Sequence, residues 1–446
     1  MQRDRAVVVV TLAAAALRLA WNLLVHRPTS FAFSDMGGYL ERAKEIFDDA
    51  ARAHTWFGAN WRPRPHTTLF PWGTHALVFF AKLPFGRDAR APVDAAFALL
   101  GAAGVGYTYA AARRLAPDRP WLTTAFGALL VVYYPWIALS GYALSEPGLA
   151  AGVGAAAFYA LRLADRGRAR DAIALGAAIG VGAIFRPQML LSGALVALVF
   201  VLRRRSFPRV GRRALVLAAL PLALCLGVSS ARIAFHNRRL GLVSTNGPLN
   251  FAFGRCHAPA LEQRAPGSAG FFGPPPFGMM LAYEKTHPGA WFKLEPVVEK
   301  LSLHGYMWDE APLDRMARAC VEKSGLAKQA SFAITHVVML WAYDDVWPDA
   351  ATGFRREMAR WARAVLVLQP LPLLFALARS LRRRRARELL VAAHVFALLA
   401  TAMIYFGDAR MRVPYDGVAW LLAVVAAASA LRWLRAEAPG LLRSGP

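Results

Sequence analysis

Two acidic residues stand beside apolar segments, where a membrane protein has little structural need of charge. Asp35 follows the first apolar stretch of the chain, and Glu146 directly precedes a later one. A carboxylate so placed can act as a general base that takes a proton from a hydroxyl group. It can also start a helix, because an acid in the first turn interacts favourably with the helix dipole. The residue types alone leave both interpretations open.

Arginines accompany these acids. Arg410 and Arg412 lie between two apolar stretches near the C-terminus, and Arg186 lies at the end of another stretch. Arginine keeps its charge and binds phosphate through parallel N–H groups. Such a clamp would stabilise negative charge that grows on a phosphate leaving group. The structural alternative is contact with lipid headgroups or an ion pair with Asp408.

The composition indicates the elements that must position these side chains. The 446 residues are 57% hydrophobic, with a mean hydropathy of +0.34, which is too apolar for a soluble domain. We expect an all-α polytopic membrane protein, a single domain over residues 1–446 with about ten transmembrane helices. The expected spans lie near residues 6–26, 92–112, 121–141, 147–163, 171–186, 187–202, 214–234, 362–380, 388–406 and 414–434.

The net charge of +25 follows the expected topology. Clusters of arginine fall in alternate short loops, as the positive-inside rule requires, so both termini are predicted to be cytoplasmic. No basic and aromatic nucleic-acid module accompanies the charge, which argues against nucleic acid and for membrane lipid as a partner. The clusters include Arg113–Arg114, Arg166–Arg170, Arg203–Arg205 and Arg382–Arg387.

Two long segments, residues 27–91 and 235–361, are predicted on the outer face. The first contains apolar residues from Met36 to Ala50 at helical spacing, which predicts an amphipathic helix lying flat at the membrane interface. Ser34 is its expected N-cap, and Asp35 would lie in its first turn. The apolar stretch Ala76–Phe85 is too short to span a membrane and predicts a second interfacial or re-entrant helix.

Cysteine and histidine residues give few constraints. Cys256 and Cys320 both fall in the second outer segment, where a disulfide and two free thiols are equally compatible with the sequence. The histidines lack zinc-site spacing, and the chain has no Asp-x-Asp pair. We therefore predict no metal-ligand set, although a divalent cation near the carboxylates stays open.

Short motifs occur in an order that resembles the GT-C superfamily of membrane glycosyltransferases, which use polyprenyl-phosphate sugars as donors. The likeness extends from about residue 5 to 435, and it is greatest to the branch of protein O-mannosyltransferases and aminoarabinose transferases. One departure is that Met36 follows Asp35, where several relatives carry an acidic pair. The motifs are Ser34–Asp35 with Tyr39, Phe70–His75, Leu144–Glu146, Phe185–Pro187, Ser244–Gly254 and Arg410–Pro414.

The resemblance implies a fold, an activity and a set of site residues. It implies interfacial helices and a catalytic acid in the first outer loop, which corresponds to Asp35, with Glu146 as a second carboxylate. It implies inverting transfer of a sugar from a polyprenyl-phosphate donor to a glycan, lipid or protein at the periplasmic face of a bacterial inner membrane. The expected substrate-binding residues are Arg186, Arg410, Arg412, Tyr39, His75 and Asn250.

Two other functions are compatible with the same residues. A transporter or flippase for a lipid-linked sugar would also need arginines that bind phosphate. A non-catalytic protein of the same fold could serve in envelope assembly.

Overall fold

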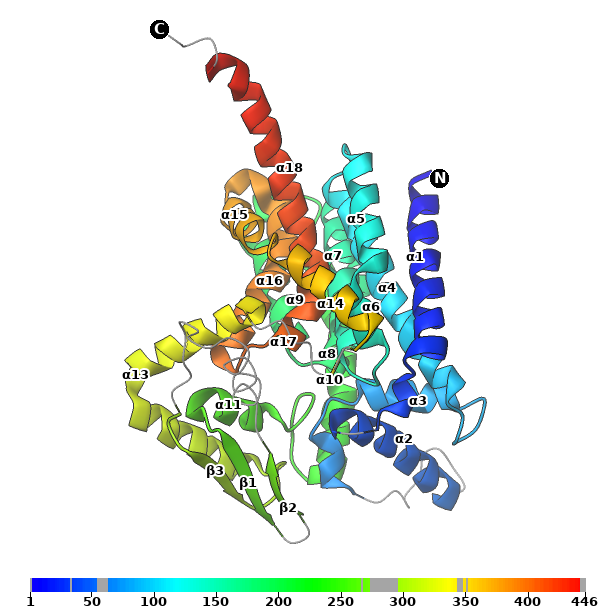
Figure 1. The fold of residues 1–446 in the computed structure, drawn as a ribbon, viewed down its shortest axis with the longest axis vertical. Helices are drawn as coiled ribbons and strands as arrows, with labels where there is room; N and C mark the ends of the chain where they lie inside the picture. Colours follow the sequence, from blue (N-terminus) through cyan, green and yellow to red (C-terminus); the bar gives the residue numbers. More distant parts are fainter. Residues whose placement is uncertain are drawn as a thin grey trace.

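The chain folds into a helix bundle with two structured segments at one end (Figure 1). The structure is a computed structural model, and it describes residues 2–32, 34–53, 63–265, 268–272, 296–342, 348–349 and 352–441. These residues are mostly helical.

Six helical segments in the described ranges are long and apolar enough to cross a membrane. Two helix pairs bent by 41° and 44° raise the number to as many as eight, so the expected count of about ten spans is not confirmed. The bent pairs are α5 (Pro120–Val132) with α6 (Tyr134–Ser140), and α14 (Phe354–Leu366) with α15 (Pro370–Ser380). The six segments are α1 (Gln2–Ala20) continued by η1 (Trp21–Val25) and η2 (Pro28–Ser30), α4 (Ala91–Leu115), α7 (Glu146–Arg166), α10 (Arg212–Asn237), α16 (Ala386–Ile404) and α17 (Ala409–Arg412) continued by η6 (Val413–Tyr415) and α18 (Asp416–Leu441).

The helices α8 (Ala169–Phe185) and α9 (Met189–Leu202) are the two short segments on either side of Pro187. They have 17 and 14 residues, fewer than the roughly 20 that a helix needs to cross a bilayer. Arg186 is extended (φ −148°, ψ 123°) because a residue before proline is disfavoured in the helical region. The break therefore leaves Arg186 outside both helices.

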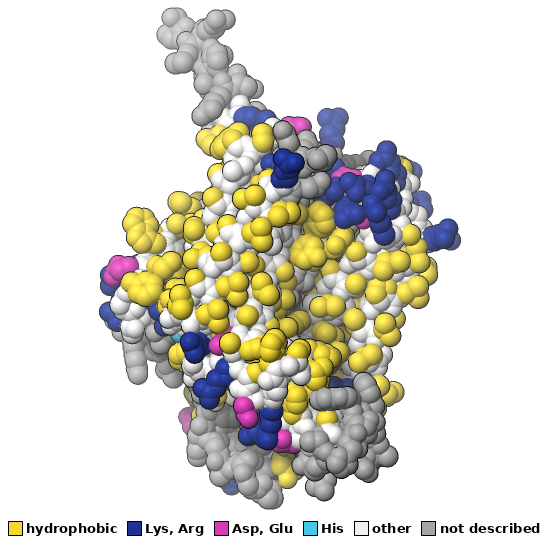
Figure 2. All heavy atoms as spheres, turned by 90° about the vertical axis from the view of Figure 1, so that its right-hand side faces the viewer, with side chains coloured by type: hydrophobic (Ala, Val, Ile, Leu, Met, Phe, Trp, Pro, Cys, Tyr) yellow, Lys and Arg dark blue, Asp and Glu magenta, His cyan; other side chains and the backbone are white. Residues whose placement is uncertain are grey.

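The middle of the bundle is apolar, and its two ends differ in charge. Figure 2 shows a hydrophobic band between an end where Lys and Arg gather and an end of mixed charge. At the arginine-rich end, where α1 begins, Asp165 pairs with Arg114 at 3.1 Å and with Arg387 at 2.6 Å. The short 3-10 helices η4 (Arg204–Ser206) and η5 (Arg383–Arg385) also fall in the basic loops.

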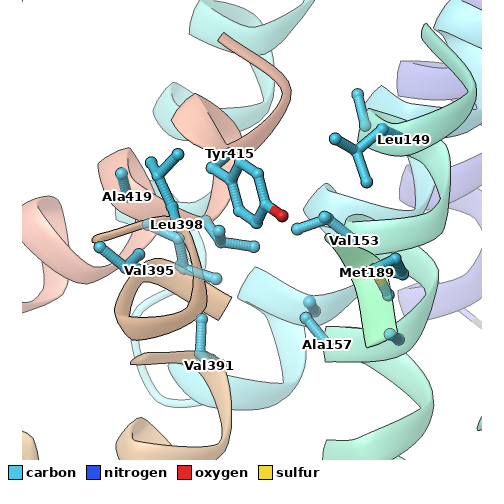
Figure 3. Packing of buried hydrophobic residues seen from close by; sticks show 14 of the residues in the cluster. Leu149, Val153, Ala157, Met189, Val391, Val395, Leu398, Tyr415 and Ala419 are labelled. Atoms are coloured by element: carbon cyan, nitrogen blue, oxygen red, sulfur yellow. The ribbon is translucent and has the colours of Figure 1, made fainter. Parts of the chain in front are cut away.

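The core brings α7, α9, α16 and α18 together around Tyr415. Figure 3 shows its ring between Leu149 and Val153 of α7 on one side and Val395 and Leu398 of α16 on the other. These side chains are almost completely buried. The turn that carries residues 409–415 is thereby fixed against the start of α7.

The segment between α1 and α4 lies at the opposite end from the arginine-rich loops (Figure 1). It contains α2 (Ser34–Ala53), η3 (Pro65–Thr68) and α3 (Gly73–Lys82). As the periodicity predicts, α2 is amphipathic, and Met36, Tyr39 and Ala43 are buried against the bundle. Ser34 has a φ of 52°, an uncommon conformation for a residue other than glycine, and Asp35 follows it in the first turn.

The segment between α10 and α14 departs from the all-α expectation because it contains a small sheet. The strand order is β2–β1–β3; β1 pairs antiparallel with β2 and parallel with β3. In this register, Leu261 of the central strand β1 lies opposite Phe272 of β2 and opposite Leu301 of β3. The segment comprises α11 (Gly247–Cys256), β1 (Ala260–Ala265), β2 (Ser268–Phe272), β3 (Lys300–His304) and α13 (Glu310–Ala342), which is kinked at Gly325.

A close helix contact supplies a test of the bundle. A Cβ at Gly152 of α7 would lie 2.8 Å from the Cα of Gly182 in α8, so the two backbones touch. We expect Gly152→Val to destabilise the protein by about 1–3 kcal/mol, because the helices must separate. The matched control is Gly227→Val in α10, where an added Cβ meets nothing within 4 Å. A thermal unfolding midpoint in detergent that falls equally for both variants would contradict the packing.

Candidate active site

Four charged residues that the sequence singled out meet at the end of the bundle covered by α2. Nη2 of Arg410 lies 3.1 Å from Oδ2 of Asp35, and its Nε donates to Oε1 of Glu146. Nη2 of Arg186 donates to the same oxygen of Glu146, while its Nε donates to Ser145 Oγ at 2.9 Å. We call Asp35, Glu146, Arg186 and Arg410 the charge cluster.

Breaks in the helices place these side chains. Glu146 is the first residue of α7, and Arg186 is the extended residue between α8 and α9. Arg410 lies in the short helix α17, which begins where Asp408 Oδ1 accepts the N–H of Met411 at 2.8 Å. Each break frees a charged side chain to turn toward the others instead of continuing along a helix.

The side chains of the charge cluster differ in their exposure to solvent. The Glu146 side chain is 1% exposed and that of Arg410 is 10% exposed, whereas the Asp35 side chain is 25% exposed. Glu146 is thus a buried counter-ion for Arg186 and Arg410, and Asp35 is the carboxylate of the cluster that another molecule can reach. The two acids and two arginines balance in formal charge, so the cluster offers no net positive charge to an anion.

Tyr39 and His75 lie beside the charge cluster and are buried. Burial, and next the charge of Asp35, raise the pKa of the Tyr39 phenol to about 12. Burial and the nearby guanidinium groups of Arg232 and Arg42 hold the pKa of His75 well below its usual value. The two rings are 6.5 Å apart, and both groups are neutral near pH 7.

Two further arginines, Arg42 and Arg232, lie near Tyr39 and His75. Arg42 is 8% exposed, lies over the ring of Phe70 at 4.9 Å and donates from Nη2 to the carbonyl oxygen of His66 at 3.3 Å. Its Nε and Nη1 have no hydrogen-bond partner in the described part of the protein. Arg232 of α10 donates from Nη2 to the carbonyl oxygen of Thr67, and its Nη1 likewise has no partner there. We call Arg42 and Arg232 the arginine pair; the neutral ring of His75 lies beside them.

Sequence reasoning missed Arg42 and Arg232. The available signal was Arg232 itself, a cation in the last part of an apolar span at the outer end, where topology does not require one. Arg42 reads in the sequence as part of the polar face of α2, but it lies buried against Phe70.

Two other predicted residues lie apart from the charge cluster. Arg412 is fully buried, pairs through Nε with Asp416 at 3.1 Å and donates to the carbonyl oxygen of Leu340 at 2.9 Å. It therefore ties α17 to α18 and α13, away from Arg410. Asn250 is in α11, and no contact in the described residues joins its side chain to the charge cluster.

A small cavity adjoins Glu146 on the side of the bundle core. Its volume of about 10 Å³ has room for roughly one water molecule. No group of three or more His, Cys, Asp or Glu residues in the described part of the chain is arranged to hold a metal ion. The cavity is lined by Gly101, Trp136, Leu139, Glu146, Pro147, Ala150, Val413 and Pro414.

The fold is shared with solved membrane glycosyltransferases. The archaeal oligosaccharyltransferase AglB from Archaeoglobus fulgidus, solved with an inhibitory peptide and a dolichol-phosphate, matches at a TM-score of 0.50 and 13% identity, over 100% of this chain and 52% of its own. A structure of the Archaeoglobus fulgidus oligosaccharyltransferase tethered to an acceptor peptide gives 0.47 and 15%, over 97% and 50%. ArnT from Cupriavidus metallidurans, bound to undecaprenyl phosphate, gives 0.40 and 15%, over 98% and 81%.

The match to AglB shows a GT-C-like fold, as the sequence motifs predict. The chain spans about half the length of AglB. No protein-family model matches the chain, and no curated protein matches its sequence. At 13% identity the likeness shows the fold and not the reaction, which depends on the residues of the site.

Removing the buried acid tests the charge balance of the cluster. Glu146→Gln would leave Arg186 and Arg410 without their shared carboxylate, and we expect a loss of about 3–5 kcal/mol in stability. Glu357→Gln is the control, since it removes an exposed partner of Arg360 and should change stability by less than about 1 kcal/mol. Equal thermal unfolding midpoints for the two purified variants would contradict the assigned role of Glu146.

Proposed function

We propose that the protein is an inverting glycosyltransferase that moves a sugar from a polyprenyl-phosphate donor to a hydroxyl group of an acceptor. The observation that carries the proposal is an accessible carboxylate, Asp35, held by Arg410 near the arginine pair, whose buried N–H groups lack acceptors among the described residues. The GT-C-like fold supports the class of reaction. The acceptor is a glycan, a lipid or a protein.

Asp35 acts as the general base in this proposal. The acceptor oxygen attacks the anomeric carbon of the sugar from the side opposite the phosphate, and its proton passes to Asp35. The bond between the anomeric carbon and the phosphate oxygen breaks, and its electron pair leaves with the polyprenyl phosphate. Arg410 fixes the direction of the carboxylate through the 3.1 Å contact, and Glu146 with Arg186 fixes Arg410.

The arginine pair holds the donor phosphate in this proposal. Arg410 and Arg186 already share Glu146, whereas Arg42 and Arg232 have N–H groups without acceptors and no carboxylate at ion-pair distance in the described ranges. A phosphate placed there would accept these N–H groups and meet positive charge as its own negative charge grows. Arg412, which the sequence grouped with Arg410, pairs with Asp416 and is given no part in phosphate binding.

The position of Arg232 supports entry of the donor from the bilayer. It lies five residues before the end of α10, whose outward side chains include the exposed Leu224, Val228 and Phe235. A cation at that depth can meet a lipid phosphate that slides in beside the helix. We place this end at the periplasmic face of a bacterial inner membrane, because the arginine-rich loops and the start of α1 lie at the other end (Figures 1 and 2).

The assignment of the base is tested by Asp35→Asn. We expect turnover to fall at least 100-fold, with the KM for the donor changed less than about 3-fold, because the amide cannot take the proton. Labelled polyprenyl-phosphate sugar in proteoliposomes reports both transfer to an added membrane extract and release of sugar to water. Glu41→Gln on the exposed face of α2 is the matched control. Full turnover of Asp35→Asn would rule out the base, and movement of labelled lipid between leaflets without transfer would indicate a flippase.

The assignment of phosphate binding to the arginine pair is tested by Arg42→Gln and Arg232→Gln. Each should raise the KM for the donor about 10–100-fold, as expected for loss of a charged hydrogen bond worth about 1.5–3 kcal/mol. Arg87→Gln is the control, since Arg87 lies at the same end of the bundle in an exposed pair with Asp48. An unchanged donor KM in both variants would mean that the phosphate binds elsewhere.

A further inference from the structure

The hairpin that carries Arg410 is covered by a distant part of the chain. This hairpin, residues 403–412, connects α16 to α18. Nη2 of Arg255 donates to the carbonyl oxygen of Met403 at 2.8 Å, and Gly254 lies so close to the carbonyl of Tyr405 that a Cβ there would collide with it. From the far side, the carbonyl oxygen of Leu340 accepts from Nη1 of Arg412 at 2.9 Å. Residues of α11 and α13 thus hold the backbone on one side of Arg410 and the Arg412 side chain on the other.

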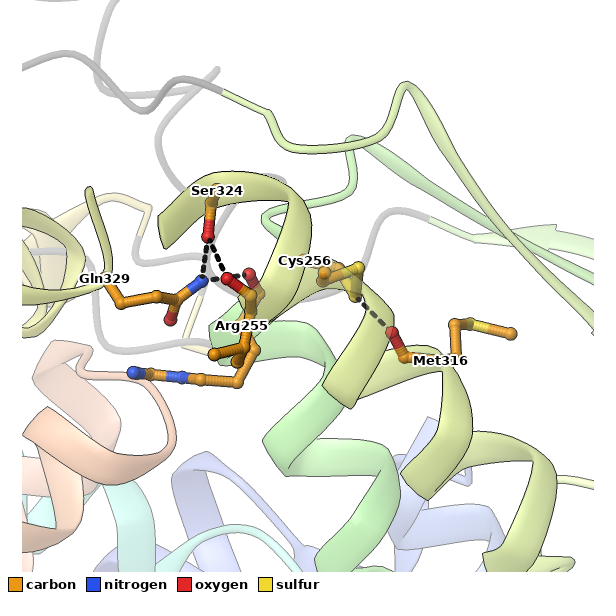
Figure 4. Close-up of a disulfide and its surroundings, with 7 residues drawn as sticks. Arg255, Cys256, Met316, Ser324 and Gln329 are labelled. Carbon is orange, nitrogen blue, oxygen red and sulfur yellow. Dashed lines mark hydrogen bonds between the residues drawn. A yellow bond between two sulfur atoms is a disulfide. The ribbon is translucent and has the colours of Figure 1, made fainter. Parts of the chain in front are cut away.

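A disulfide and a buried amide hold α11 and α13 to each other. Cys256 at the end of α11 is bonded to Cys320 of α13, 64 residues later, so the pairing left open by the sequence is resolved as a disulfide. Nε2 of Gln329 donates to the carbonyl oxygen of Arg255 at 2.9 Å and to Ser324 Oγ at 2.8 Å (Figure 4). We call α11 and α13 together the clamp.

A pair of histidines adds a third link within the clamp. Nε2 of His257 lies 2.9 Å from Nε2 of His336, and the ring of Phe332 is stacked on His257 at 3.5 Å. Burial lowers the pKa of His257 to about 2 and that of His336 to about 3. Both rings are therefore neutral near pH 7, and one donates its N–H to the other. His257, which follows Cys256, is thus also held to α13 through His336.

We propose that the clamp is a positioning device for the Arg410–Asp35 pair, and that the Cys256–Cys320 disulfide makes this positioning dependent on the redox state. The proposal rests on the proposed function only in its effect on turnover, since its structural part concerns the hairpin alone. Reduction by a dithiol converts the disulfide into two thiols and oxidises the reductant to its cyclic disulfide. The clamp then loses its covalent link, and the hairpin loses part of the surface that holds Arg410 against Asp35. A displacement of about 1 Å between catalytic groups can cost on the order of 100-fold in rate.

Hydrogen exchange tests the structural part without any substrate. The full-length protein in proteoliposomes is compared in three forms: oxidised, reduced with dithiothreitol, and as the double variant Cys256→Ser/Cys320→Ser. We expect the amides of residues 403–412 to exchange at least 10-fold faster in the second and third forms. Cys225→Ser excludes an effect of the reductant on the one free cysteine among the described residues. Unchanged exchange of residues 403–412 would overturn the proposal, whether or not the protein is a transferase.

A double-mutant cycle tests the catalytic part. Arg410→Lys should lower turnover in the oxidised protein, and the same change should add little once the disulfide is absent, because the pair is already misplaced. Gln329→Met loosens the clamp without touching the cysteines and should lower turnover about 10-fold with little change in the donor KM. Gln263→Ala, which breaks a contact with Gly305 at the sheet, is the matched control with unchanged turnover. Additive effects of Arg410→Lys and disulfide loss would overturn the positioning role, whereas no turnover in any form would count against the proposed function alone.

Discussion

The carboxylate of Glu146 imposes the strongest constraint on this fold. It is buried at the start of α7 in a bundle of apolar helices, where an isolated charge would be very costly. Two arginines offset that cost by pairing with the carboxylate, and each extends from a break in the helices rather than from the middle of a long one. Arg186 reaches Glu146 because the chain breaks before Pro187, and Arg410 reaches it because α16 and α18 are separated by the short turn of α17. Two of the breaks in the bundle, before Pro187 and at α17, therefore serve one buried charge.

Some parts of the fold could be predicted from the sequence, and others could not. The amphipathic period of α2 predicts a helix with Met36, Tyr39 and Ala43 buried, as found. The three-stranded sheet was not predicted, because β1 and β3 are short and carry charged residues, and their pairing joins segments almost 40 residues apart. Strand pairing over such a separation depends on contacts that no local pattern records.

The same holds for the site: a local pattern in the sequence indicates which residues are charged, but not which residues they contact. Arg410 and Arg412 look equivalent in the sequence, yet their side chains diverge from a short helix, one to Asp35 and Glu146 and the other to Asp416. Sequence position gave the correct end of the molecule for both, but not their partners. Arg232 can be noticed in the sequence as a cation near the outer end of an apolar span, whereas Arg42 cannot. That both have N–H groups without an acceptor among the described residues is visible only once the neighbours are placed.

The outer side of α10 determines how a ligand can reach Arg232. The helix is largely uncovered by protein, since the exposed Leu224 and Val228 precede Arg232 along it and the exposed Phe235 follows. A ligand that reaches Arg232 along this side never leaves the bilayer. Its encounters are set by lateral diffusion in two dimensions, and its effective concentration is a mole fraction among lipids rather than a molarity in water. Added detergent or lipid would then weaken the apparent affinity by dilution, while every atom of the site stayed where it is.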